Sequence, residues 1–232
     1  MTIPALAASP LFGLTITVVV FSAAKWVYTR TRIFLLHPVL VSIAVIIVIL
    51  KIAKIDYTAY MNGGSIINFF LAPSVVALGL PLYENLSRLR EHSGTLILTT
   101  LFASVVGITA SILPAIIFGA NREVLASLAP KSVTTPIAMV ISRGIGGLPS
   151  LTATVVVLSG VVGAVVGPIV LRLVGITGGI AFGFALGTAS HGIGTARAIE
   201  AGQLEGASSS LALCLNGILT AILTPLIVRL IV

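Results

Sequence analysis

Long apolar runs without a charged residue dominate this chain. Seven of them reach the length of about 18 residues that marks a candidate membrane-spanning helix. They lie at residues 1–24, 33–50, 57–83, 93–121, 144–171, 173–196 and 206–228. Lys131 alone interrupts an eighth run, residues 124–142. The pattern predicts an all-α polytopic integral membrane protein with about eight membrane segments.

The loops between the runs are short, so we expect a single membrane domain over residues 1–232. We place the segments at residues 6–27, 33–53, 63–86, 95–118, 123–143, 148–171, 178–200 and 208–231. Prolines interrupt the third segment at Pro73 and Pro81 and the fifth at Pro130 and Pro136. Because proline lacks the amide hydrogen that a helix needs, these positions predict broken or re-entrant helices. Paired glycines mark the starts that we expect for the third and seventh segments.

The two halves of the chain share a weak internal similarity. The matching positions are His37-Pro38 with Leu148-Pro149, Gly63-Gly64 with Gly178-Gly179, and Pro114 with Pro225. This predicts two repeats, residues 1–120 and 121–232. The repeats are inverted if the third and seventh segments enter and leave the membrane on one side, and parallel if all segments cross. We expect the inverted arrangement, although the loop charges leave both open.

Composition narrows the function classes. Hydrophobic residues make up 57% of the chain, and 13 basic against six acidic residues give a net charge of +7. The basic residues stand singly in short loops, where they orient a membrane protein, so no nucleic acid is expected as a partner. Three histidines and one cysteine without ligand spacing predict no metal and no cofactor. We find no nucleophile–base pair or phosphate-binding loop and expect no enzyme.

The fifth segment carries the strongest candidate chemistry. A lysine at the centre of a membrane helix costs about 2.5–3.5 kcal/mol, yet Lys131 stands there beside Ser132, Thr134 and Thr135. If the helix begins at Pro130, free backbone N–H groups lie beside these side chains. Such donors suit an anion, above all a small hydroxy- or keto-carboxylate. Alternatively, the lysine snorkels to the interface and the threonines bond to their own helix.

The seventh segment supplies a second polar stretch. Its candidate substrate-binding residues are Thr188, Ser190, His191, Thr195 and Arg197. The alternative is tight helix packing through Gly179, Gly183 and Gly187, which recur every four residues. Both interpretations are compatible, since a glycine ladder admits a neighbouring helix while the polar half lines a cavity. Weaker candidates are Asn68, Ser74, Arg143 and Asn216.

All six acidic residues lie at the ends of the predicted segments. They are Asp56, Glu84, Glu91, Glu123, Glu200 and Glu205. Cation carriers usually hold a carboxylate deep in the membrane, so this distribution favours an anionic substrate.

Three stretches resemble the LrgB/CidB family. Residues 128–138 (LAPKSVTTPIA) and 187–197 (GTASHGIGTAR) look like its two signature stretches, and residues 71–83 (LAPSVVALGLPLY) look like a third. Bacterial members are described as antiholin-like regulators of murein hydrolase export and autolysis, paired with a small holin-like protein of the LrgA/CidA type. The similar region of the plastid glycolate/glycerate translocator implies carboxylate transport, and some bacterial members are linked to pyruvate.

Together, the residues and the resemblance predict a transporter of small monocarboxylates that works by alternating access. The resemblance also implies an alternative, an antiholin-like regulator of murein hydrolase export that acts with a holin-like partner. We expect a multi-pass protein of the bacterial cytoplasmic (inner) membrane. Its expected partners are the lipid bilayer, a small organic anion, a second copy of the chain and an LrgA/CidA-type membrane protein.

Overall fold

The computed structural model describes residues 9–31, 33, 36–70, 73, 76–77 and 79–231 of the chain. Throughout these residues the regular structure is helical and no strand occurs, which confirms the all-α prediction. The chain divides into two compact units, Met1–Ala77 and Leu78–Val232. The eight segments, the single membrane domain and the two repeats remain predictions.

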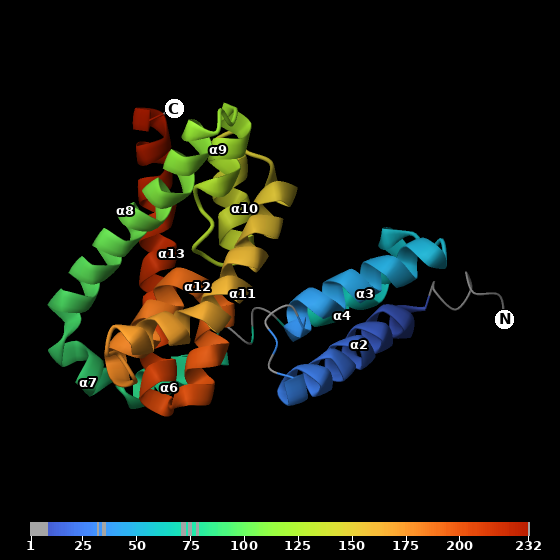
Figure 1. Cartoon of the computed structure of the whole chain (residues 1–232), viewed down its shortest axis with the longest axis horizontal. Coiled ribbons are helices and arrows are strands. Elements are labelled where there is room, and N and C mark those ends of the chain that lie inside the picture. The colour runs from blue at the N-terminus through green and yellow to red at the C-terminus, as the bar shows by residue number, and fades with distance from the viewer. Residues whose placement is uncertain are drawn as a thin grey trace. The chain divides into compact units, whose positions relative to one another are not determined.

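The first unit contains α2 (Pro10–Thr31), α3 (Pro38–Ile52) and α4 (Tyr57–Phe69), and α2 packs against the other two (Figure 1). A Cβ atom on Gly13 of α2 would lie 3.1 Å from the Cα of Gly63, so the two helices cross where both lack side chains. The prediction that Gly63 begins a helix is wrong. It lies inside α4, where the crossing requires a glycine, and α4 begins six residues earlier.

The second unit carries the candidate site. Its helices are α6 (Gly79–Glu84), α7 (Leu86–Glu91), α8 (Ser93–Ile117), α9 (Arg122–Leu128), α10 (Thr135–Gly144), α11 (Pro149–Leu173), α12 (Gly179–Ala201) and α13 (Gln203–Ile231). In Figure 1, α8 and α13 run side by side, and α12 packs between α11 and α13. Thus α8, α11 and α13 match three predicted segments closely.

Within the described residues, four helices are long and apolar enough to cross a membrane: α2, α8, α11 and α13. The 25 residues of α8 extend about 38 Å, more than the roughly 30 Å of a bilayer core. Helix α3 is equally apolar but has only 15 residues. Large apolar side chains such as Leu98 and Leu226 are more than half exposed, as expected for faces in contact with lipid. These features define a multi-pass membrane protein.

The fifth predicted segment is two short helices rather than one. Helix α9 begins after Asn121, whose side chain accepts a hydrogen bond from the Val124 amide at 3.0 Å. Residues 129–134 form a non-helical turn, and α10 begins only at Thr135. Beyond α10, the Leu148 amide donates to the Ser127 hydroxyl of α9 at 2.7 Å. The chain has therefore returned to the level of the last turn of α9, and we call α9, the 129–134 turn and α10 the first hairpin.

This hairpin corrects the expected geometry around Lys131. The prediction that the helix begins at Pro130, with Lys131 and Thr134 on one helical face, is wrong. Thr134 has an extended backbone and caps the start of α10, where Pro136 occupies one of the first two helical positions. Proline is well suited to that place because the amide it lacks would be unpaired there. Lys131 consequently lies in the turn.

Helix α12 also doubles back on itself. Its backbone breaks at His191, which has φ 42° and ψ −133° and separates residues 179–190 from 192–201. A straight helix of 23 residues would extend about 34 Å. Instead, the Glu205 carboxylate lies against both ends: it accepts the Gly179 amide at 2.7 Å, and a Cβ on Gly202 would lie 3.2 Å from its carboxyl carbon. The two halves therefore form a second hairpin.

Candidate functional site

The turns of the two hairpins are joined by a single buried amide. The side-chain nitrogen of Asn216 in α13 donates to the carbonyl oxygen of Ser132 at 2.9 Å and to that of Thr188 at 3.1 Å. The side-chain oxygen of Asn216 accepts from the Ser104 hydroxyl of α8 at 2.8 Å. Ser132 and Thr188, which precede Asn216 by 84 and 28 positions in the chain, thus meet at one point halfway along α13.

Helix α11 supports both turns. The Ser159 hydroxyl donates to the carbonyl of Lys131 at 3.0 Å. One helical turn earlier, the Val156 carbonyl accepts a hydrogen bond from His191 Nε2, also at 3.0 Å. A Cβ on Gly160 would lie only 2.6 Å from that nitrogen, so the histidine ring reaches the α11 backbone because Gly160 has no side chain. These contacts hold both non-helical segments at mid-helix depth.

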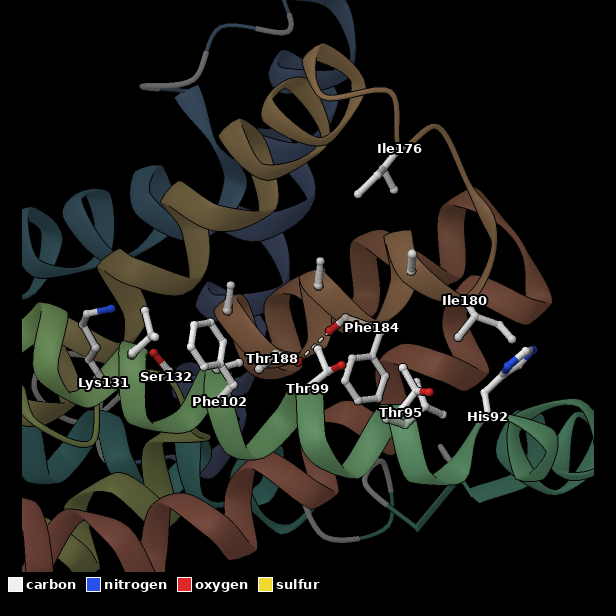
Figure 2. Close-up of a pocket in the computed structure, with 17 residues that line it drawn as sticks. His92, Thr95, Thr99, Phe102, Lys131, Ser132, Ile176, Ile180, Phe184 and Thr188 are labelled. Atoms are coloured by element: carbon white, nitrogen blue, oxygen red, sulfur yellow. Dashed lines mark hydrogen bonds between the residues drawn. The ribbon is translucent and has the colours of Figure 1, made fainter.

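A cavity of about 750 Å³ lies between α8, the 129–134 turn and the first half of α12. Its polar lining residues are His92, Thr95, Thr99, Lys131, Ser132 and Thr188. Figure 2 shows Lys131 and Ser132 gathered at one end and His92 at the other, with Phe102 and Phe184 between them. Of the candidates from sequence, the structure brings Lys131, Ser132 and Thr188 together.

Lys131 is the candidate anion-binding group. It is half-buried, and no carboxylate of the described residues lies within 4 Å of its ammonium group. The described part of the chain contains one ion pair, between Arg197 and Glu200 at 2.9 Å, and neither residue lines the cavity. An ammonium group without a protein counter-charge favours an anion beside it, because the partly dry surroundings strengthen that attraction.

The hydroxyls of Ser132 and Thr188, which both line the cavity, play different parts. Within the described residues, the Ser132 hydroxyl has no hydrogen-bond partner, so it is free to donate to a ligand. The Thr188 hydroxyl already donates to the Phe184 carbonyl at 2.7 Å, which leaves only its acceptor lone pairs (Figure 2). The lysine end therefore offers donors for a carboxylate, and Thr188, which Figure 2 shows beyond Phe102, offers an acceptor further along the cavity.

The other main candidates lie outside the cavity lining. Thr134 and Thr135 are half-buried at the start of α10. Within the α12 hairpin, the Thr195 hydroxyl donates to the His191 carbonyl at 2.9 Å and accepts from Ser209 of α13 at 3.0 Å. The polar residues after the break thus hold the hairpin together.

Ser190 and two glycines of α12 pack the α12 hairpin against its neighbouring helices. Ser190 is fully buried, without a hydrogen-bond partner for its hydroxyl in the described structure, and it lies against Gly163 of α11. The packing role predicted for Gly183 and Gly187 is present, since both lie directly on the backbone of α13. Gly179 does not contribute to it: a Cβ there would meet open space, and its φ of +73° is the feature that favours glycine.

The weaker candidates are dispersed. Asn68 is exposed near the end of α4 in the first unit, and Arg143 is exposed near the end of α10. Ser74 lies outside the described residues. Asn216 is buried and bridges the two turns rather than lining the cavity.

Sequence reasoning missed the α8 wall of the cavity. His92, Thr95 and Thr99 follow one another at spacings of three and four, which places them on one helical face. That polar stripe was readable in an otherwise apolar segment. Phe102 and Phe184 gave no comparable signal, because aromatic residues are common throughout apolar helices.

Fold and site define a polytopic helical membrane protein in which two hairpin turns meet beside a cavity with a cationic end. The chain belongs to the LrgB-like family, whose model matches residues 17–230. It is 33% identical to the antiholin-like protein LrgB of Bacillus subtilis over 96% of this chain and 97% of the relative. An uncharacterized protein of Haemophilus influenzae is 36% identical, with 93% and 94% covered. No solved structure matches.

Proposed function

We propose that this chain carries small monocarboxylates of the glycolate, glycerate or pyruvate type across the bacterial inner membrane by alternating access. The observation that carries the proposal is the Lys131 ammonium, which lines a cavity without a protein counter-charge among the described residues. Ser132 adds a free donor beside it. No acidic residue lines the cavity among those described, so an anion entering it meets no like charge.

The two hairpins supply the moving parts of this mechanism. Their turns contain non-helical backbone at mid-helix depth, the arrangement that carriers use to bind substrates near the membrane midplane. The 129–134 turn carries Lys131, and the α12 hairpin carries Thr188. A shift of either hairpin along the long helices α8, α11 and α13 changes the side from which the cavity is reached. The substrate thereby gains access to each side in turn.

Purified protein in liposomes tests the proposal with radiolabelled glycolate, glycerate and pyruvate. We expect saturable uptake of at least one acid. Lys131→Ala should lower uptake at subsaturating substrate by about tenfold or more, since a charge-assisted hydrogen bond contributes about 1.5–3 kcal/mol. Lys131→Arg should retain part of the activity. Lys51→Ala removes an exposed lysine of α3 and should leave uptake unchanged. Uptake that is unaffected by Lys131→Ala would refute the proposal.

A second candidate function rests on the names of the relatives. Several are antiholin-like LrgB proteins, which favours a regulator of murein hydrolase export and autolysis acting with a small holin-like protein. This alternative predicts stable co-purification with an LrgA/CidA-type protein and no saturable uptake. It also predicts that Lys131→Ala restores normal autolysis in a deletion strain as well as the wild type does. Failure of that rescue, with normal expression, favours the carrier. Light scattering of the purified protein tests the predicted homodimer.

A further inference from the structure

The cavity is far larger than a two- or three-carbon acid requires. Volumes of about 300–1,000 Å³ are typical of pockets for drug-sized ligands, and this one measures about 750 Å³. Its lining positions on α8 run from Thr95 to Gly107, about 18 Å along the helix axis. Lys131 and Ser132 occupy only one end (Figure 2). A glycolate or pyruvate bound to them would leave most of the cavity unfilled.

The rest of the wall is predominantly apolar. Between the lysine end and His92 the lining includes Phe102, Phe184 and Ile180, together with several alanines. The hydroxyls of Thr95, Thr99 and Thr188 are the polar groups on that wall. Apolar surface of this extent stabilises a ligand that removes it from water, by about 25 cal/mol per Å². Charge and apolar surface thus occupy separate parts of one cavity.

We propose that the preferred ligands are monocarboxylates with an apolar body, whose carboxylate binds Lys131 and Ser132 while the body extends along α8 and the first half of α12. This inference rests on the proposed function and specifies its substrate class. The ligand has one negative charge because Lys131 is the one lysine or arginine among the described residues that line the cavity. Aromatic or branched acids from water and fatty acids from the bilayer share this chemistry.

Lactate and 3-phenyllactate provide a matched test, since they have the same head group and differ only by a phenyl ring. Binding to the full-length protein in nanodiscs is measured by calorimetry. We expect 3-phenyllactate to bind at least about tenfold more tightly than lactate, because its ring removes further apolar surface from water. Lys131→Gln should weaken both acids. The neutral amide of 3-phenyllactate should bind poorly.

Variants that fill the distal half of the cavity separate the contribution of the ligand's apolar body to binding from that of its carboxylate head group. Ala181 of α12 is exposed and lines the cavity, whereas Ala196 of the same helix is exposed and does not. Ala181→Phe should abolish the preference for 3-phenyllactate and leave lactate binding intact. Ala196→Phe, an identical change outside the cavity, should alter neither. Ala185→Phe repeats the test from the middle of the wall if the first variant fails to fold.

The outcomes distinguish this inference from the proposed function. Equal affinity for the two acids, with saturable uptake of short ones, overturns the apolar-body inference and leaves the carrier intact. Binding of neither acid by a folded protein overturns both. Octanoate and oleate, added to the nanodiscs, distinguish the source: competition of 3-phenyllactate by octanoate indicates an aqueous acid. Competition by oleate alone indicates a ligand from the bilayer. Either result supports the inference, and no competition by any apolar acid contradicts it.

Discussion

The side-chain amide of Asn216 lies 2.9 Å from the carbonyl oxygen of Ser132, in hydrogen-bonding geometry. Its second amide hydrogen reaches the carbonyl of Thr188 at 3.1 Å. Both carbonyls belong to non-helical or terminal backbone whose usual helical partner is missing. A single asparagine therefore satisfies the two turns and sets their separation, and with it the distance between Lys131 and the α12 wall.

We predict that Asn216→Leu destabilises the second unit and weakens uptake. Leucine has the same branched shape and number of heavy atoms but leaves the carbonyls of Ser132 and Thr188 unpaired, which should cost about 1–3 kcal/mol of unfolding free energy. The unfolding midpoint, followed by circular dichroism in detergent, should fall by about 2–10 °C. Asn62→Leu makes the same change at an exposed position of α4 and should have little effect. An unchanged midpoint in Asn216→Leu would show that the bridge is not structural.

The length of the apolar runs predicted α8, α11 and α13 within a few residues. It succeeded because a continuous helix is the simplest way to satisfy backbone groups away from water. The direction of the chain after a break was not predictable from the same signal. Pro130 shows where a helix ends, but the contact between Ser127 and Leu148 determines that α10 returns toward α9.

The sequence also showed which polar residues lie within apolar runs, but not which of them line the cavity. Lys131, Ser132 and Thr188 line the cavity, and their role in substrate binding stays a prediction. Polar groups in apolar runs require a compensating environment. For His191 and Thr195 that environment is the hairpin itself, through the Val156 carbonyl and the Ser209 hydroxyl. These partners lie 35 and 14 residues away, so the local pattern could not distinguish a ligand site from internal hydrogen bonds.

Because α12 is a hairpin, we predict that its two ends lie on the same side of the membrane. Thr177→Cys and Gln203→Cys, made singly after Cys214→Ala removes the natural thiol, place exposed cysteines just outside the two ends of α12. Both should react with a membrane-impermeant maleimide from the same side of oriented vesicles. Ser150→Cys, at the far end of the spanning α11, should react from the opposite side. Labelling of positions 177 and 203 from opposite sides would mean that α12 crosses the membrane.

Glu205 should stabilise the closed ends of that hairpin. Its carboxylate accepts the Gly179 amide and also lies in the first turn of α13, where negative charge is favourable. Glu205→Ala should therefore lower the unfolding free energy by about 1–2 kcal/mol. Glu200→Ala should change it by less than about 0.5 kcal/mol, because its ion pair with Arg197 is exposed to solvent. Thermal unfolding of the two variants in parallel checks the difference, and equal losses would contradict the role of Glu205.

The contact between α11 and the turn of the α12 hairpin leads us to predict opposite outcomes for alanine substitutions at two glycines. A methyl group on Gly163 would overlap the Ser190 side chain, and because Ser190 is fully buried it has no room to move aside. Gly163→Ala should cost about 1–3 kcal/mol and reduce uptake, since the turn that carries Thr188 must shift. Gly192 lies in open space just beyond the break, so Gly192→Ala should be neutral or stabilise the helix by up to about 1 kcal/mol. Unfolding midpoints and uptake measured on both variants decide the matter: equal tolerance of the two alanines would show that the turn does not depend on close packing against α11.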